Sequence, residues 1–186
     1  WSATSCATVV VDEAYGDFAG ESVAQDVADH DNLVVLRSFS KGYALAGFRL
    51  GYVVAQPKLL EDMVLESTWF NVAYTSVGAG VAALEHEDYF ADIRATILAE
   101  REKFEAFLVG AGFTLMPSSI NAVLLHFTDE TDATDFTLSL EENEILVNQG
   151  NGASNTGLDK RFVRITIGTP EQMQLVTKVI SELRFF

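Results

Sequence analysis

Three short apolar runs, rich in β-branched residues, dominate the first third of the chain: "ATVVVDEAY", "NLVVLRSFS" and "RLGYVVA". Short apolar runs of this kind, bounded by polar or turn residues, are typical of buried strands. The first run ends in Asp12 and Glu13, and the second leads into a pair of serines. The pattern predicts a sheet with polar side chains at the carboxyl ends of its strands.

The apolar spacing changes to a helical period after the third run. "PKLLEDMVLES" begins with Pro57, which suits the first position of a helix because that position needs no N–H. Residues 76–85 predict a helix of small side chains, and residues 88–112 predict a long amphipathic helix that ends at two glycines. Its apolar stripe consists of Phe90, Ile93, Ile97, Phe104 and Phe107 or Leu108.

Beyond Gly112 the chain predicts strands at "NAVLLHF", "EILV" and "RFVRITI". The stretch between the first two is rich in Asp, Thr and Glu, and no element is predicted for it. A last helix should begin at Thr169, because Thr169 and Gln172 have the spacing of a capping box. We expect an α/β protein in three parts: residues 1–85, a bridging helix over 86–111, and a smaller α/β part over 112–186.

Charge and composition exclude several classes of protein. The chain has 27 acidic and 12 basic residues and a net charge of −15, which disfavours nucleic acid and anionic membrane as partners. No apolar run approaches the roughly 18 residues of a membrane span, and no signal peptide opens the chain, so we expect a cytoplasmic protein. Cys6 is the single cysteine and is interpreted as a small buried or half-buried thiol. The three histidines lack the spacing of metal ligands, so no metal is expected.

The segment "SFSKGYALAGFRLGY", residues 38–52, places a lysine directly after a predicted strand. Ser38 and Ser40 supply hydroxyl donors beside Lys41, and the guanidinium of Arg49 suits a phosphate dianion. A lysine that forms a Schiff base must be partly neutral, which burial and a cationic neighbour favour. The segment therefore predicts an amine beside an anion-binding cradle.

The end of the first strand offers groups that would complete such a site. Asp12 is a natural partner for the protonated ring nitrogen of a cofactor that acts as an electron sink. Tyr15 lies three residues later and could donate a hydrogen bond to an oxygen on the ring.

Together, "VVVDEAYGDF", "SFSKGYALAGFRLGY" and "RFVRITIGTPEQM" resemble the pyridoxal-phosphate aminotransferases of fold type I, above all the histidinol-phosphate aminotransferase branch. The resemblance implies that pyridoxal 5′-phosphate is the cofactor and that Lys41 binds it covalently and shuttles a proton. It further implies that Asp12 pairs with the pyridine nitrogen and Tyr15 with the ring hydroxyl. The phosphate would be held by Ser38, Ser40 and Arg49.

By the same resemblance, Arg164 would bind the α-carboxylate of the substrate. Strand alternation supports this role, because Phe162, Arg164 and Thr166 share the face opposite Val163 and Ile165. The substrates would be a small amino donor, such as histidinol phosphate, and a 2-oxo acid acceptor. The complete enzyme would be a homodimer.

The resemblance also implies that the chain is the C-terminal half of such an enzyme. Residues 1–85 would be the remnant of a large, mostly parallel sheet domain that binds the cofactor, and residues 112–186 the small C-terminal domain. Asn148 departs from the pattern, because the histidinol-phosphate branch usually carries an arginine there, and neither Lys160 nor Arg161 aligns with that role.

Three alternatives stay open. Fold type I decarboxylases and carbon–carbon bond-forming enzymes share the lysine segment, although a firmly held carboxylate favours transamination. Nucleotide hydrolysis would use the acids of "VVVDE" for magnesium, but the chain contains no G-x-x-x-x-G-K-[ST] loop. A chain with half of the enzyme could also be a folding or assembly unit without catalysis.

Overall fold

The computed structural model describes residues 7–65, 71–152 and 157–183. The chain divides into two compact units, Trp1–Arg94 and Ala95–Phe186. The boundary falls inside the longest helix, α4 (Glu87–Gly110), so the long helix that the apolar stripe predicts does form. The assignment of residues 1–85, 86–111 and 112–186 to functional domains stays a prediction.

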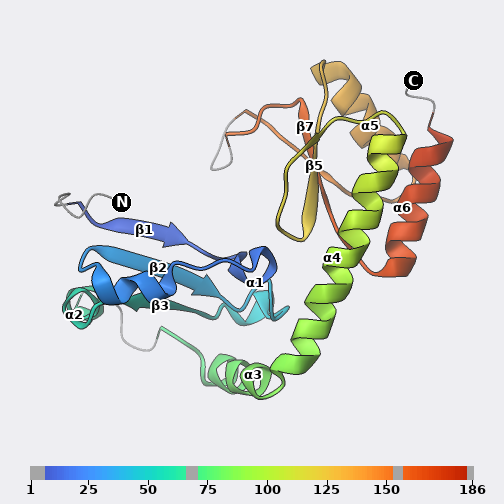
Figure 1. The fold of residues 1–186 in the computed structure, drawn as a ribbon. Helices are drawn as coiled ribbons and strands as arrows, with labels where there is room; N and C mark the ends of the chain where they lie inside the picture. Colours follow the sequence, from blue (N-terminus) through green and yellow to red (C-terminus); the bar gives the residue numbers. More distant parts are fainter. Residues whose placement is uncertain (1–6, 66–70, 153–156, 184–186) are drawn as a thin grey trace. The chain divides into compact units, whose positions relative to one another are not determined.

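The first unit is built on a three-stranded sheet, with the strands in the order β1 (Val9–Asp12), β2 (Leu33–Ser38) and β3 (Gly51–Ala55). β1 and β2 are parallel, whereas β3 runs antiparallel to β2. Figure 1 shows the three strands side by side, with α1 beyond the carboxyl ends of β1 and β2. All three apolar runs form strands, as predicted.

The helical segments of the first unit connect or follow these strands. They are α1 (Gly16–Ala19), the 3-10 helices η1 (Ala24–Asp29) and η2 (Ala46–Phe48), α2 (Pro57–Leu65) and α3 (Tyr74–Glu85). Pro57 is the first residue of α2, as its missing N–H predicts. Val27 of η1 closes a small core with Leu33 and Val35 of β2.

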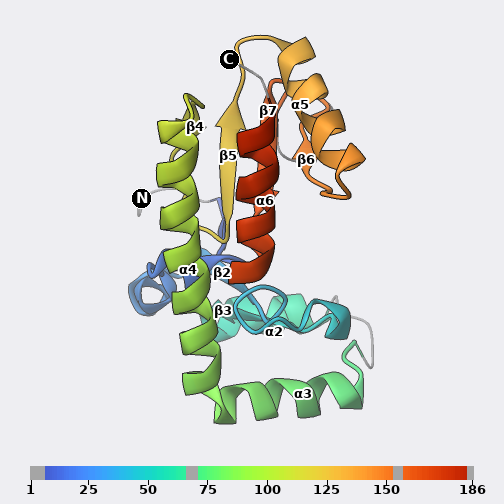
Figure 2. The same ribbon diagram turned by 90° about the vertical axis from the view of Figure 1, so that its right-hand side faces the viewer.

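The second unit contains an antiparallel sheet whose strands have the order β4-β5-β7-β6. Their bounds are β4 (Leu115–Met116), β5 (Ala122–His126), β6 (Asn148–Gln149) and β7 (Phe162–Thr166). Helices α4, α5 (Glu130–Glu142) and α6 (Pro170–Glu182) lie on one face of this sheet (Figure 1). Figure 2 shows α4 and α6 running side by side in front of that face. An α/β architecture is therefore present in both units.

The core of the second unit follows strand alternation. Val163 and Ile165 of β7 are buried against the helices, whereas Phe162, Arg164 and Thr166 on the opposite face are not fully buried. The residues of the three helices that enter this core are Phe104, Leu108, Ala133, Phe136, Leu140, Met173, Val176, Val179 and Ile180. The alternation predicted for "RFVRITI" is confirmed.

The capping box predicted for the last helix also forms. The side-chain oxygen of Thr169 accepts a hydrogen bond from the backbone N–H of Gln172, and the side chain of Gln172 accepts one from the backbone N–H of Thr169. Pro170 occupies the first helical position. These contacts satisfy N–H groups that have no partner inside the helix.

The strand predicted at "EILV" is wrong, and the adjacent helix was missed. Residues 130–142 form α5 because Asp129 caps its first turn by accepting from the N–H of Thr131. After α5, Glu144 takes a left-handed φ of 61°, and the N–H of Ile145 returns to the carbonyl of Leu140. Glu144 consequently belongs to the turn that ends the helix, residues 145–147 have no regular structure, and the strand begins only at Asn148.

Neither a membrane-spanning helix nor a metal-binding group of histidine, cysteine and acidic side chains occurs within the three described ranges. Cys6, for which we predicted a small buried or half-buried thiol, lies outside those ranges. His126 ends β5, where its ring contacts the tilted ring of Phe162 with the ring centroids 4.7 Å apart.

We predict that Leu140→Ala destabilises the second unit far more than Leu138→Ala does. Both leucines lie on α5, but Leu140 is fully buried, whereas Leu138 is half exposed. A cavity at Leu140 should lower the free energy of unfolding by about 2–5 kcal/mol. Urea unfolding followed by circular dichroism measures both variants, and equal effects would contradict the burial of this helix face.

Candidate functional site

The carboxyl ends of β1 and β2 bring two of the predicted site residues to one edge of the sheet. Asp12 is the last residue of β1 and pairs in register with Leu36, two residues before the end of β2 at Ser38. Asp12 is exposed, and its Oδ1 accepts a hydrogen bond of 2.9 Å from the N–H of Ala14. In α/β folds, ligands bind beyond this edge of the sheet.

The side chains of Lys41 and Tyr15 meet at this edge. The Nζ of Lys41 lies 5.6 Å from the centroid of the Tyr15 ring, a distance at which an ammonium is attracted to the face of the ring. Tyr15 is half-buried, whereas Lys41 is exposed, so the described residues do not supply the burial that the sequence led us to expect. The two side chains nevertheless come together from different connections, one after β1 and one after β2.

The loop between β2 and β3 is closed at its neck by a backbone hydrogen bond, and a local bond to a serine hydroxyl lies beside it. The N–H of Phe39 donates to the carbonyl of Leu50 at 3.1 Å, and the N–H of Ser40 donates to the Oγ of Ser38 at 3.0 Å. Arg49 directly precedes Leu50 on the other side of the neck and has a left-handed φ of 51°. Its exposed guanidinium is steadied by a hydrogen bond of 2.9 Å from Nη1 to the carbonyl of Ala46. The loop gathers the three residues predicted to hold a phosphate.

Beside these exposed groups lies a charge network that the sequence reasoning missed. Arg37 forms ion pairs with Glu13 at 2.9 Å and with Asp17 at 2.5 Å, and all three side chains are largely buried. Burial raises the pKa of Glu13, but hydrogen bonds from Ser22, from the N–H of Val23 and from Arg37 outweigh this effect, so its pKa lies below the usual range. The sequence feature that could have indicated this network is Glu13, a second acid directly after Asp12 at the end of the strand.

The turn after Lys41 rests on aromatic packing. The ring of Tyr43 contacts Phe39 and Phe90, with ring centroids 5.0 and 5.4 Å apart. Burial, together with a hydrogen bond to Glu87, raises the pKa of Tyr43 to about 12. Arg94 stacks over the same ring and donates to the carbonyl of Gly42 at 3.3 Å. The backbone next to Lys41 is thus fixed by side chains behind it.

The predicted substrate-binding arginine belongs to the second unit. Arg164 pairs in register with Asn148, and its Nε is buried without a hydrogen-bond partner in the described part of the chain. A pocket of about 190 Å³ opens beside it. The pocket is also lined by Asn148, Gln149, Gly150, Asn151, Leu158 and Phe162. A buried donor without an acceptor, on a residue that lines a small pocket, suits an anionic ligand.

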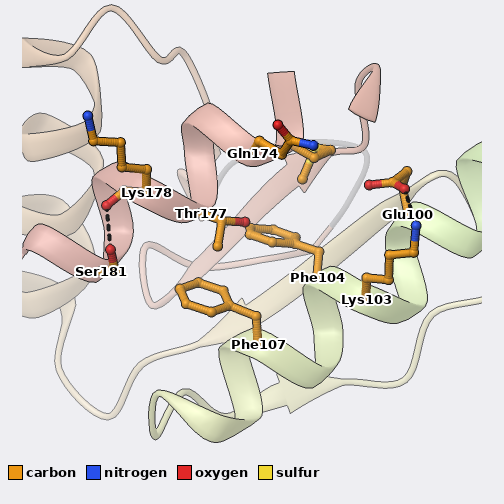
Figure 3. Close-up of a pocket in the computed structure, with 9 residues that line it drawn as sticks. Glu100, Lys103, Phe104, Phe107, Gln174, Thr177, Lys178 and Ser181 are labelled. Atoms are coloured by element: carbon orange, nitrogen blue, oxygen red, sulfur yellow. Dashed lines mark hydrogen bonds and ion pairs between the residues drawn. The ribbon is translucent and has the colours of Figure 1, made fainter. Parts of the chain in front are cut away.

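A larger pocket of about 520 Å³ lies between α4 and α6 of the second unit. Figure 3 shows Phe104 and Phe107 on α4 facing Thr177 on α6, with Lys103 bound to Glu100 at one side. None of the predicted site residues lines this pocket.

The chain is similar to known proteins over most of its length. The family model for aminotransferase class I and II matches residues 2–180. The chain belongs to this family. The histidinol-phosphate aminotransferase 1 of Bradyrhizobium diazoefficiens is 37% identical to it over 94% of the chain. The chain spans about half the length of the curated relatives it matches, covering 49% of this one.

Two solved structures of this aminotransferase-like fold illustrate the range of its relatives. The histidinol-phosphate aminotransferase of Sinorhizobium meliloti, in complex with pyridoxal-5′-phosphate, is 26% identical, with a TM-score of 0.81 over 95% of this chain and 50% of its own. The L-threonine-O-3-phosphate decarboxylase of Porphyromonas gingivalis is 29% identical, with a TM-score of 0.76 over 94% of this chain and 54% of its own. The predicted α/β fold, part of a fold type I architecture, is confirmed.

The lowered pKa of Glu13 should make the free energy of unfolding depend on pH. A carboxylate whose pKa is depressed in the folded state stabilises the protein above its unfolded value, here 4.5, and loses this effect as the pH falls through the folded value. The advantage of the wild type over Glu13→Gln should therefore be full at pH 7 and shrink progressively below pH 4.5.

Urea unfolding midpoints at neutral and acid pH measure this difference. Glu21→Gln, which changes an exposed glutamate in the same connection, is the control and should alter the midpoint little. An advantage of the wild type that stays constant with pH would show that the charge of Glu13 is not what stabilises this connection.

Proposed function

We propose that this chain carries the lysine half of a pyridoxal-phosphate-dependent aminotransferase, which transfers an amino group between an amino donor and a 2-oxo acid. The observation that supports this most is the meeting of Lys41 and Tyr15 beyond the strand end that carries Asp12. Membership of the aminotransferase family supports the same reaction. The cofactor supplies an aldehyde for the amine and an electron sink for the substrate's α-carbon.

The residues at the strand edge fit this cofactor by their chemistry. Asp12 offers an exposed carboxylate to a protonated ring nitrogen, and the hydroxyl of Tyr15 suits the ring oxygen. Ser38, Ser40 and Arg49 would hold the phosphate at the neck of the loop, where hydroxyl, amide and guanidinium donors are gathered. Lys41 would bond to the aldehyde carbon and, once released by the substrate, carry the proton that leaves the α-carbon.

Arg164 would bind the α-carboxylate of the substrate. Its buried Nε has no acceptor in the described part of the chain, and a carboxylate would supply one. A planar guanidinium binds a carboxylate through two parallel hydrogen bonds, which orients it as well as attracting it.

The identity of the amino donor is a finer proposal. Histidinol phosphate is favoured by the name of the Bradyrhizobium relative, but Asn148 beside Arg164 offers no charge for a second anionic group. Donors with a neutral side chain are the second candidate for this reason. Decarboxylation is the alternative reaction, supported by the similarity to the Porphyromonas enzyme.

For the complete protein we further propose a homodimer located in the cytoplasm. The partners would be the small amino donor and the 2-oxo acid, with no role for nucleic acid, since the charge of −15 repels polyanions.

We predict that Lys41 is the residue that captures pyridoxal phosphate. Adding the cofactor to the chain should produce an absorbance band near the edge of the visible range, and borohydride should then fix the cofactor to Lys41, as mapped by mass spectrometry. Lys41→Ala should abolish both signals. Lys58→Ala, which removes another exposed lysine of the same unit, should abolish neither. Absence of the band in the wild type, or its survival in Lys41→Ala, would refute the proposal.

We predict that Arg164→Lys lowers kcat/KM for the amino donor by about 10- to 100-fold in the full-length protein, because a lysine keeps the charge but loses the paired hydrogen bonds. Arg161→Lys is a matched control, since Arg161 is already paired with Asp159 at 2.6 Å. A donor panel that includes histidinol phosphate distinguishes the two donor classes. Release of carbon dioxide, without turnover that depends on a 2-oxo acid acceptor, would favour the decarboxylase alternative. A larger loss of kcat/KM in Arg161→Lys than in Arg164→Lys would contradict the role of Arg164 in binding the substrate.

A further inference from the structure

The buried network beside the strand edge touches the turn that carries Lys41. The two carboxylate oxygens of Asp17 have different contacts. Oδ1 is held by the Nη2 of Arg37 at 2.5 Å, while Oδ2 occupies the space into which a side chain at Gly42 would extend. A Cβ added at Gly42 would lie 2.6 Å from the Cβ of Asp17 and still closer to Oδ2. Asp17 therefore blocks the space behind the residue that directly follows Lys41.

The other contacts of Arg37 make Asp17 a rigid support. Nη1 of Arg37 binds Glu13, which is itself held by Ser22 and by the N–H of Val23. The side chains of Arg37, Glu13 and Asp17 are only 17%, 8% and 11% exposed, so water screens these ion pairs less than it screens pairs at the surface. Glycine at position 16 leaves room for the guanidinium, because a Cβ there would lie 2.9 Å from Nη1.

Two contacts thus join the same pair of segments. Tyr15 and Asp17 come from the start of α1, and Lys41 and Gly42 come from the turn after β2. Tyr15 meets Lys41 through their side chains, and Asp17 meets Gly42 through close packing. The packing of Gly42 against Asp17 limits where Lys41 can meet Tyr15, because Gly42 is bonded to Lys41 and cannot move toward α1.

We propose that Asp17, held in place by Arg37, is a positioning residue that keeps the amine of Lys41 over Tyr15 at the cofactor edge. The proposal rests on the proposed function of Lys41 for its consequence, but the positioning itself is a property of the chain without cofactor. When Asp17 is removed, the turn gains room behind Gly42 and the Lys41 side chain leaves the ring.

The test is pulse labelling of lysine amines in the cofactor-free chain with acetic anhydride, quantified for each lysine by mass spectrometry. In Asp17→Ala, the labelling rate of Lys41 should rise several-fold relative to that of Lys58, which serves as an internal reference. Asp26→Ala, which removes an exposed acid from the same connection, should leave the ratio unchanged.

A second pair of variants tests the same contact from the other side. Gly42→Ala should also raise the ratio, because its new methyl group collides with Asp17. Gly47→Ala, in the same loop, meets nothing within 4 Å and should not raise it. An unchanged ratio in both folded variants, Asp17→Ala and Gly42→Ala, would overturn the proposal, even if their thermal midpoints fall.

Cofactor capture separates this proposal from the proposed function. If the wild type captures pyridoxal phosphate, Asp17→Ala should weaken its affinity about tenfold, and the pH midpoint of the bound chromophore should shift, which a loss of stability alone would not cause. Wild-type affinity and midpoint in that variant would contradict the positioning role. If the wild type captures no pyridoxal phosphate, the proposed function of Lys41 is wrong for this chain. The labelling ratio of Lys41 to Lys58 still decides whether Asp17 is a positioning residue.

Discussion

The parallel pairing of β1 with β2 is the constraint on which the candidate cofactor site depends. Because both strands end at the same edge, the two connections that follow them must begin side by side. Asp12 and Tyr15 belong to one connection, and Lys41 belongs to the other. A register shifted by one residue would turn Val11 and Val35 away from their present faces and separate these groups as well.

The chemistry at this edge is divided between exposed and buried residues. Asp12, Lys41 and Arg49 are exposed and available to a ligand, whereas Glu13, Asp17 and Arg37 are largely buried and contact one another. Buried ion pairs add little net stability unless their remaining hydrogen-bonding capacity is satisfied. Here Glu13 accepts from three donors, so the network can fix the backbone on both sides of the site without leaving a charge unpaired.

Much of the fold could be predicted from the sequence because its elements follow simple periodicities. The three strands of the first unit, the long helix and the capped helix at Thr169 all formed as the patterns indicated. Helix α5 was missed because its buried face consists of only Ala133, Phe136 and Leu140 among acidic and threonine residues, which mask the helical period. "EILV" has the composition of a strand, but the helix end before it and the left-handed Glu144 keep it out of the sheet. Spacing along the chain could propose Lys41, Asp12 and Arg49 as a group, but not the pairing of Lys41 with Tyr15, which depends on two turns folding against each other.

The same limit explains why the supporting network was invisible in the sequence. An arginine in a strand and two acids in the connection before it have no periodicity that links them, and each could be interpreted as a solvated surface charge. Only the folded chain shows that three groups at the edge each adjoin a constrained neighbour: Asp12 precedes buried Glu13, Tyr15 precedes Gly16 against Arg37, and Lys41 precedes Gly42 against Asp17. A flexible lysine gains a defined position only if its backbone cannot move, and we propose that the packing of Gly42 against Asp17 supplies that restraint. On this proposal, the candidate site depends as much on the residues that never reach a ligand as on those that would.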